Sequence, residues 1–463
     1  MMMMTLTTHR DDDDGDDDEE EGEMNSPQRA LKRQRDAEAR AVTSDAARDA
    51  GRRASLEALK VKTVVREAHG ASATTHCEYA HGGSKVWNLF ATCGGELVTI
   101  YDDEHFGDHV SVVAQYANAG GAGGARGAGG AVTSVAWVCT GYGESKTSDT
   151  TTVGDGKEND KGSSNKTTKK TNAAKRTKTA SAPEDESRRA THEFGDAVLA
   201  VGDENGVISV ISVAGNRVVA RLHAHEGAVI DLSGASAAEG FLVSVGADGE
   251  MKTWDVFGGE DGEGECLNTY SARDGVCVAC KADGSGAITG HKAGVVKDWT
   301  FASADAAPTT LSFKMSFSPK HDVDCVRVVN DVVFAKTTNM CFGTFDLKRN
   351  ESLHSWEVPN KQHRAKARLE NSRFGVTSDG KFLACGDGVN SGVVYTYDAR
   401  TGTLISELEP LRVTGVVRAA HVSDHCRHVL ASYGPGVVWR YEIIPSVDAA
   451  NDAANDAFEA VVK

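Results

Sequence analysis

Cys277 and Cys280 form the one close pair among ten cysteines, and a Cys-X-X-Cys spacing can support redox chemistry or zinc binding. No second pair has matching spacing, and no histidine follows at the distance found in a zinc finger. The surrounding run GVCVACKAD alternates like a buried strand, so we expect the two thiols on opposite faces of a sheet. The pair is therefore predicted to be structural, without metal or cofactor, in a reducing compartment.

Other patterns that mark catalysis or nucleotide binding are incomplete. The glycine-rich run GGAGGARGAGG at 120–130 resembles a phosphate-binding loop but lacks the Gly-Lys-Ser/Thr ending. The sequence has neither a G-x-S-x-G nucleophile elbow nor an H-E-x-x-H zinc motif. Catalysis needs a reactive group and its partner converging on one pocket, so the missing motifs favour a protein that is not an enzyme.

Apolar segments of one shape recur along the chain. In FLVSVGADGEMKTWDV (241–256) an apolar run meets a tight polar turn, and a second run ends on Trp-Asp. Six further segments share this shape, at 88–103, 197–213, 284–301, 330–347, 381–399 and 427–443. After a first step of 110 residues, the equivalent end positions are 43 to 52 residues apart. These end positions are Tyr101, Ile211, Trp254, Trp299, Phe345, Tyr397 and Tyr441.

A strand–turn–strand unit that repeats about every 45 residues is the signature of a WD-repeat β-propeller. The first, longer step fits this period once the polar segment 139–195 is subtracted. Each blade of such a ring has four antiparallel strands, and the repeat ends on the third strand. We therefore predict an all-β fold, a seven-bladed WD-repeat β-propeller.

The best-preserved copy holds four residues placed to form a buried hydrogen-bond network, namely His225, Ser244, Asp248 and Trp254. Asp248 in the turn can accept a hydrogen bond from His225, and the indole N–H of Trp254 can donate to Ser244. Buried polar groups require such partners. We therefore expect His225 to be structural rather than catalytic or metal-binding.

The propeller is predicted to span residues 56–446, with three polar regions outside the ring. Residues 1–55, which include the acidic block DDDDGDDDEEEGE, and the low-complexity insertion 139–195 are predicted to be disordered, because too few apolar side chains offset the ordering entropy. Residues 447–463 are predicted to form a polar tail. The segment LKVKTVVREAH (59–69) is expected to close the ring as the outer strand of the last blade.

Charge and targeting signals narrow the function classes. The acidic block supplies 11 acidic groups of a chain with net charge −17, so we expect no broad basic face for direct nucleic-acid binding. Neither a signal peptide nor an apolar run of about 18 residues is found, so neither secretion nor a membrane span is predicted. Basic clusters at 32–35 and 169–178 predict nuclear localisation.

One stretch, HDVDCVRVVNDVVFAKTTN (321–339), resembles the Polycomb WD-repeat proteins EED, Extra sex combs and fertilization-independent endosperm protein. The similarity covers most of 59–444 at low identity, and Val-Asp-Cys-Val-Arg at 323–327 is its most specific part. The resemblance implies a core scaffold subunit of Polycomb repressive complex 2. One face of the ring would hold a helix of a SET-domain histone methyltransferase, and the other would read trimethyl-lysine of a histone tail.

The resemblance transfers unevenly to individual residues. The channel residues Asp324, Arg373 and Arg418 match their motifs, and the resemblance implies that they bind peptide. Other channel positions have lost their polar side chains, at Ile230, Ala247 and Gly275. The aromatic cage that holds trimethyl-lysine by cation–π attraction aligns with Thr75, Thr133, Glu370 and Asn371, none of which is aromatic. The scaffold role therefore transfers better than the reader role.

An alternative within the same class stays open. A WD-repeat adaptor could act in replication-origin chromatin, ubiquitin ligation or trafficking, without reading methyl-lysine.

Overall fold

The computed structural model describes residues 44–67, 74–80, 88–105, 109–118, 129–140, 197–259, 262–301, 307–313, 320–359, 371–388, 391–410, 415–434 and 436–444. The chain divides into two compact units, 1–55 and 56–463. The predictions of disorder for 1–43, of an insertion over most of 139–195 and of a polar tail at 447–463 lie outside the described residues.

Residues 44–58 are helical, so the expectation of disorder is wrong for 44–55. The sequence here is rich in alanine, the best helix former. Asp49 and Arg52 add an ion pair one turn apart, with 3.7 Å between the charged atoms. No helix within the described residues is long and apolar enough to cross a membrane.

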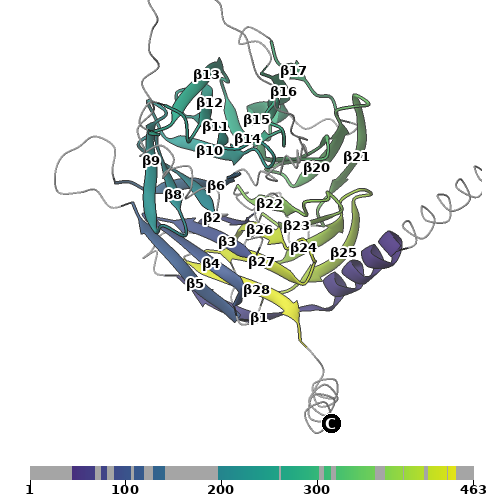
Figure 1. Ribbon diagram of the computed structural model, residues 1–463. Coiled ribbons are helices and arrows are strands. Elements are labelled where there is room, and N and C mark those ends of the chain that lie inside the picture. The colour runs from purple at the N-terminus through teal and green to yellow at the C-terminus, as the bar shows by residue number, and fades with distance from the viewer. Residues whose placement is uncertain are drawn as a thin grey trace, which may run out of the picture. The chain divides into compact units, whose positions relative to one another are not determined.

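The second unit is built from four-stranded antiparallel sheets, the blades, that surround a common centre (Figure 1). The first blade contains β2 (Thr74–Tyr79), β3 (Leu89–Gly94), β4 (Leu97–His105) and β5 (His109–Ala117). The second contains β6 (Val132–Val138), β7 (Val198–Asp203), β8 (Val207–Ser212) and β9 (Arg217–His223). The third contains β10 (Val229–Gly234), β11 (Phe241–Gly246), β12 (Glu250–Asp255) and β13 (Glu265–Ser271).

The fourth blade contains β14 (Gly275–Cys280), β15 (Gly286–His291), β16 (Val296–Thr300) and β17 (Thr309–Thr310), with a short 3-10 turn, η1 (Lys292–Gly294), between its middle strands. The fifth contains β18 (Val323–Val329), β19 (Val332–Thr337), β20 (Cys341–Asp346) and β21 (Glu351–Glu357). The sixth contains β22 (Arg373–Val376), β23 (Phe382–Gly386), β24 (Val394–Asp398) and β25 (Thr403–Leu408). The last contains β26 (Val417–Val422), β27 (His428–Tyr433), β28 (Val437–Ile443) and β1 (Leu59–Arg66).

The last two blades are joined into one eight-stranded sheet by a short parallel pairing of their first strands, β22 and β26. Only two residue pairs make this contact, Arg373 with Ala419 and Phe374 with Ala420. First strands lie nearest the centre, where neighbouring blades approach most closely (Figure 1). The two halves are therefore separate blades, and the described residues form seven blades, as predicted.

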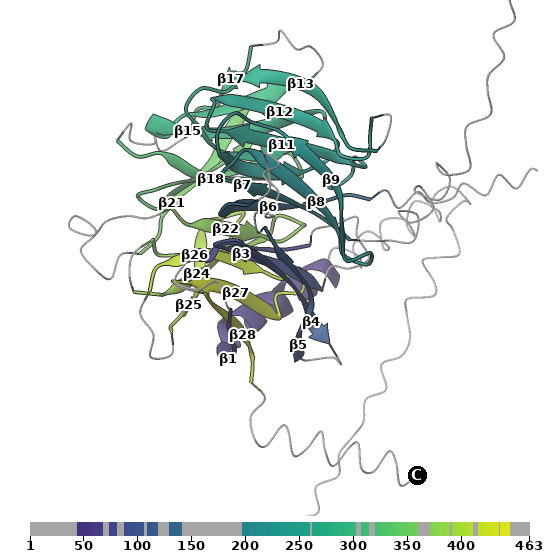
Figure 2. The same ribbon diagram turned by 90° about the vertical axis from the view of Figure 1, so that its left-hand side faces the viewer.

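Seven hydrophobic clusters support this count, because each fills one interface between neighbouring blades. One cluster, for example, joins Val210 of the second blade to Val229 and Trp254 of the third, and Figure 2 shows the strands of these blades side by side. Cys277 belongs to the cluster shared with the fifth blade, and Cys280 to the one shared with the third. The two thiols thus lie on opposite faces, as predicted.

The repeated segments of the sequence form the second and third strands of the blades. Their seven end positions all fall on third strands, and every one of these side chains is at most 5% exposed. The pattern was visible in the sequence because a middle strand is covered on both faces and on both edges.

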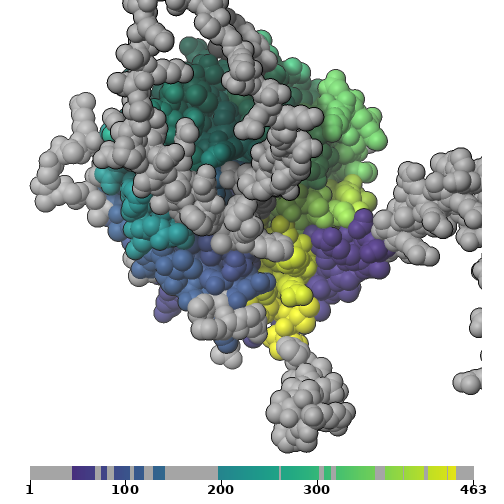
Figure 3. All heavy atoms as spheres, viewed as in Figure 1, coloured from purple at the N-terminus to yellow at the C-terminus, as the bar shows by residue number. Residues whose placement is uncertain are grey.

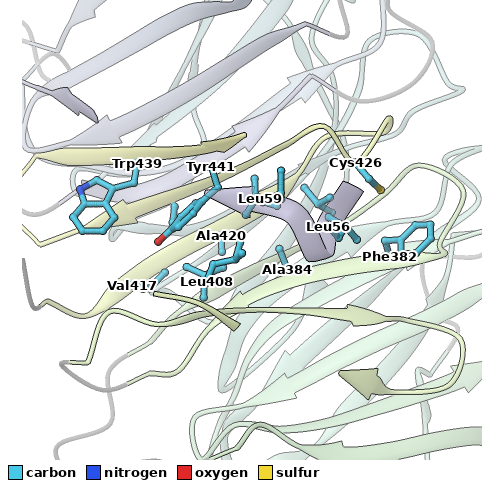
Figure 4. Packing of buried hydrophobic residues seen from close by; sticks show 14 of the residues in the cluster. Leu56, Leu59, Phe382, Ala384, Leu408, Val417, Ala420, Cys426, Trp439 and Tyr441 are labelled. Carbon is cyan, nitrogen blue, oxygen red and sulfur yellow. The ribbon is translucent and has the colours of Figure 1, made fainter. Parts of the chain in front are cut away.

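The ring is closed by β1, which pairs antiparallel with β28 from Leu59–Ile443 to Arg66–Val437. This confirms the predicted outer strand. Leu56 and Leu59 pack beside Trp439 and Tyr441 in the cluster between the sixth and last blades (Figure 4). In the space-filling view the yellow strands of the last blade lie directly beside the blue strands of the first (Figure 3).

Candidate functional site

The four residues predicted to form a network in the third blade are linked in the order Asp248, His225, Ser244, Trp254. His225 lies before β10, and its Nδ1 is 3.0 Å from an Asp248 oxygen in the β11–β12 turn. The other ring nitrogen is 2.8 Å from the Ser244 hydroxyl, which also accepts a 2.9 Å hydrogen bond from the Trp254 indole. Burial lowers the pKa of His225, against the effect of Asp248. The neutral ring therefore donates from Nδ1 to Asp248 and accepts at Nε2 from Ser244.

This network has no room for a substrate. The His225 side chain is fully buried. A Cβ added at Gly246 would lie 2.3 Å from the His225 ring, so only glycine allows the ring to pack against the end of β11. Each donor has an acceptor, so the network fixes the loop before the third blade to that blade's central turn.

The fourth blade contains an equivalent network that the sequence did not reveal. The Thr289 hydroxyl accepts a 2.7 Å hydrogen bond from the Trp299 indole and lies 2.7 Å from Nε2 of His291. Burial lowers the pKa of His291 to about 4, so this ring is neutral, and Nδ1 lies 3.0 Å from the Arg273 carbonyl. The histidine comes from the end of the second strand rather than from the loop before the blade. The sequence feature that could have indicated this network is the Gly-His pair at 290–291.

A second polar cluster lies at the amino ends of the innermost strands. Arg373 at the start of β22 reaches Asp231 of β10 with 2.7 Å between the charged atoms, although the two blades are not neighbours. Asp231 also accepts hydrogen bonds from the Ser134 hydroxyl and the Val278 backbone N–H. This one carboxylate thus ties together the second, third, fourth and sixth blades.

Asp324 lies on β18 and is paired with Lys336 of the neighbouring strand β19. The ammonium nitrogen is 2.6 Å from both carboxylate oxygens, and neither side chain is exposed. The backbone N–H of Ser372 donates a further hydrogen bond of 3.1 Å. Burial raises the pKa of Asp324, and Lys336 opposes that rise. The peptide-binding role predicted for Asp324 therefore conflicts with its position, because its fully buried carboxylate is enclosed by Lys336 of the fifth blade and the Ser372 backbone just before the sixth.

The remaining predicted channel residues are more accessible. Arg418 on β26 is half-buried, and the Arg373 side chain is 14% exposed. At the aligned cage positions, the Thr75 hydroxyl donates to the Cys93 carbonyl and the Thr133 hydroxyl to the Gly202 carbonyl. Asn371 is exposed, and Glu370 lies outside the described residues.

A cavity of about 230 Å³ lies at the opposite, carboxyl ends of six innermost strands. Neighbouring first strands run in the same direction, as the parallel pairing of β22 and β26 shows, so their carboxyl ends gather at one end of the ring. Arg327 and Glu78 are the charged side chains among the lining residues, and Trp137 contributes an aromatic ring. Sequence reasoning missed Arg327 as a separate feature, although it is the one cation in the run VDCVRVV.

Comparison with known proteins places the fold but not the family. No family model matches the sequence, and no curated protein matches it. The chain is similar to a solved structure described as the crystal structure of the mitotic checkpoint complex, with a TM-score of 0.53 and 13% sequence identity over 83% of this chain and 92% of that one. At this identity the likeness shows the propeller fold alone. The resemblance to Polycomb WD-repeat proteins therefore stays a prediction.

Proposed function

We propose that this chain is a non-catalytic scaffold that holds protein partners in a multi-subunit complex. The observation that carries the proposal is that its most chemically capable side chains bond to one another. His225 is enclosed in a structural network, Asp231 is held by Arg373, and Asp324 by Lys336. Such contacts stiffen a ring whose outer surfaces remain for partners.

The finer proposal is that the complex is a Polycomb-type histone methyltransferase complex in the nucleus. Its support is the Val-Asp-Cys-Val-Arg motif at 323–327, which forms the innermost strand of the fifth blade. The partner would be a SET-domain methyltransferase subunit. A methyl-lysine reader is not part of the proposal, because Thr75, Thr133 and Asn371 supply no aromatic ring.

A second candidate is an adaptor in another assembly. The observation that favours it is the likeness to a propeller structure from the mitotic checkpoint complex, which is itself a multi-protein assembly.

Affinity purification of the tagged full-length chain from nuclear extract, followed by quantitative mass spectrometry, separates the two candidates. We expect a SET-domain methyltransferase in near-stoichiometric amount. A variant with Trp254→Arg, which disrupts the third blade, serves as the control for partners that need the folded ring. Enrichment of a different assembly would favour the adaptor, and recovery of the chain alone would contradict the scaffold role.

A further inference from the structure

The cavity at the carboxyl ends of the innermost strands has walls from six of the seven blades. The residues that line this cavity include Glu78, Trp137, Ser233, Cys280, Arg327 and Val376. Most of the remaining wall is made of alanine, valine and leucine side chains. The site is therefore an apolar enclosure with two charged groups, at the end of the ring opposite the Asp231–Arg373 pair.

Arg327 is the under-satisfied group in this enclosure. Its Nη1 donates a 3.0 Å hydrogen bond to the carbonyl of Val326, its own neighbour in the chain. Its Nε is buried and has no hydrogen-bond partner among the described residues. Two other arginines of the ring differ, because Arg373 is paired with Asp231 and Arg440 with Asp103. A guanidinium offers five N–H donors in a fork that matches a carboxylate, and the one side-chain hydrogen bond of Arg327 among the described residues uses a single donor.

Glu78 does not meet this need. It lies close enough to attract Arg327 electrostatically, but no carboxylate in the described part of the chain lies within ion-pair distance of that guanidinium. Glu78 instead contacts His76 Nε2 at 3.3 Å. His76 accepts the Val135 N–H at Nδ1, so the proton of its neutral ring sits on Nε2 and faces Glu78. The Glu78 carboxylate thus lies against the His76 ring, whereas Arg327 donates only to a backbone carbonyl and has no carboxylate partner among the described residues.

The size of the cavity limits what can fill it. A volume of about 230 Å³ exceeds the space of a few waters, at about 30 Å³ each. Pockets for cofactors and drug-sized ligands usually have about 300–1,000 Å³. One or two side chains of a protein segment fit this range, with one carboxylate for Arg327 and apolar atoms for the walls.

We propose that this cavity binds a segment of a partner protein, which inserts an aspartate or glutamate against Arg327 and an adjacent apolar side chain against the alanine- and valine-lined wall. The proposal rests on the scaffold role only in that the occupant is a protein segment. It does not depend on which complex the ring joins.

The test is a ligand-observed NMR titration of the purified full-length chain with two capped pentapeptides, acetyl-Ala-Leu-Glu-Leu-Ala-amide and the same peptide with glutamine for glutamate. We expect the glutamate peptide to bind at least tenfold more tightly. Arg327→Gln should abolish this preference, and Glu78→Gln should preserve or strengthen binding because a like charge is removed. The matched control is Arg349→Gln, an exposed arginine of the same blade, which should change nothing.

Equal binding of the two peptides, or an unchanged preference in Arg327→Gln, would overturn the proposal. So would a loss of binding in Glu78→Gln alone, which would indicate a basic occupant, or displacement of the peptide by inorganic phosphate at equal concentration. If Arg327→Gln fails to fold, Ser236→Trp tests the same point, because Ser236 is an exposed residue of the cavity rim and the indole would fill the space. If the full-length chain purifies without partners but still binds the glutamate peptide, only the proposed scaffold function is contradicted.

Discussion

At the scale of single residues, the ring illustrates how buried polar groups satisfy one another through series of linked hydrogen bonds. Ser244 is the central link in one of them, because its hydroxyl contacts both His225 and Trp254. Removing one hydroxyl therefore leaves two buried groups without their partner. The same arrangement with threonine in the fourth blade indicates that a hydroxyl, rather than serine itself, is the requirement.

Ser244→Ala should lower the free energy of unfolding by about 1–3 kcal/mol, since a buried donor left unsatisfied costs about that much. Urea denaturation followed by far-UV circular dichroism measures the change. Ser271→Ala, at an exposed position at the end of the same blade, is the matched control and should stay within about 0.5 kcal/mol. Equal stability of the two variants would mean that the network is not structural.

The Asp324–Lys336 pair allows a prediction with a pH dependence. Lys336→Met leaves a fully buried carboxylate without its counter-charge and should cost about 3–5 kcal/mol near neutral pH. Burial without the ammonium raises the pKa of Asp324 further, so the folded state binds a proton that the unfolded state has released. Stability of this variant should therefore increase as pH falls from 8 toward 5.

Lys348→Met removes the same charge from the exposed Lys348–Asp331 pair of the same blade, where the lysine side chain is 79% exposed. Exposed pairs contribute at most about 1 kcal/mol, so this control should change little at any pH. A Lys336→Met variant as stable at pH 8 as at pH 5 would show that Asp324 keeps its charge balanced by other means.

At the scale of elements, the middle hairpins of the blades were predictable and the contacts across the ring were not. Alternating apolar residues, tight turns and the repeat period predicted the seven strand–turn–strand segments and the closing segment at 59–69. Asp231 and Arg373 are 142 residues apart, and no local pattern indicates that they meet. The helix at 44–58 was missed because its support is alanine content rather than an apolar stripe. The lysine partner of Asp324 was missed because a lysine in a strand usually faces solvent.

The closing strand should depend on its inward side chains. Leu59→Ala removes a buried side chain, 4% exposed, from the cluster beside Tyr441 and should cost about 2–5 kcal/mol. Val64→Ala, on the same strand with 53% exposure, should cost less than about 0.5 kcal/mol. Urea denaturation of both variants measures the difference. Similar costs would mean that β1 is held by backbone pairing alone.

At the scale of the whole molecule, the two ends of the ring differ. The amino ends of the innermost strands meet in ion pairs, whereas the carboxyl ends surround a cavity. The first end is the one where the resemblance would place a trimethyl-lysine reader. There, Thr75 and Thr133 already donate their hydroxyls to backbone carbonyls.

We therefore expect that this end does not distinguish trimethylated from unmethylated lysine. Cation–π contacts contribute about 0.5–2 kcal/mol each, and the aligned positions supply none. Matched histone-tail peptides titrated against the purified chain should differ in affinity by less than about tenfold, or about 1.4 kcal/mol. A larger preference for trimethyl-lysine would show that another aromatic side chain completes a cage.

The pairing of β1 with β28 also sets the order of events during synthesis. Among the described strands, the one at residues 59–66 is made first and its partner at 437–443 is made last. Until then β1 has no neighbour to pair with, and the first and last blades cannot pack together. Earlier blades can form their own hairpins one by one, because those contacts are local. Completion of the ring must wait for β28, so β1 stays without its partner strand while the intervening blades are made.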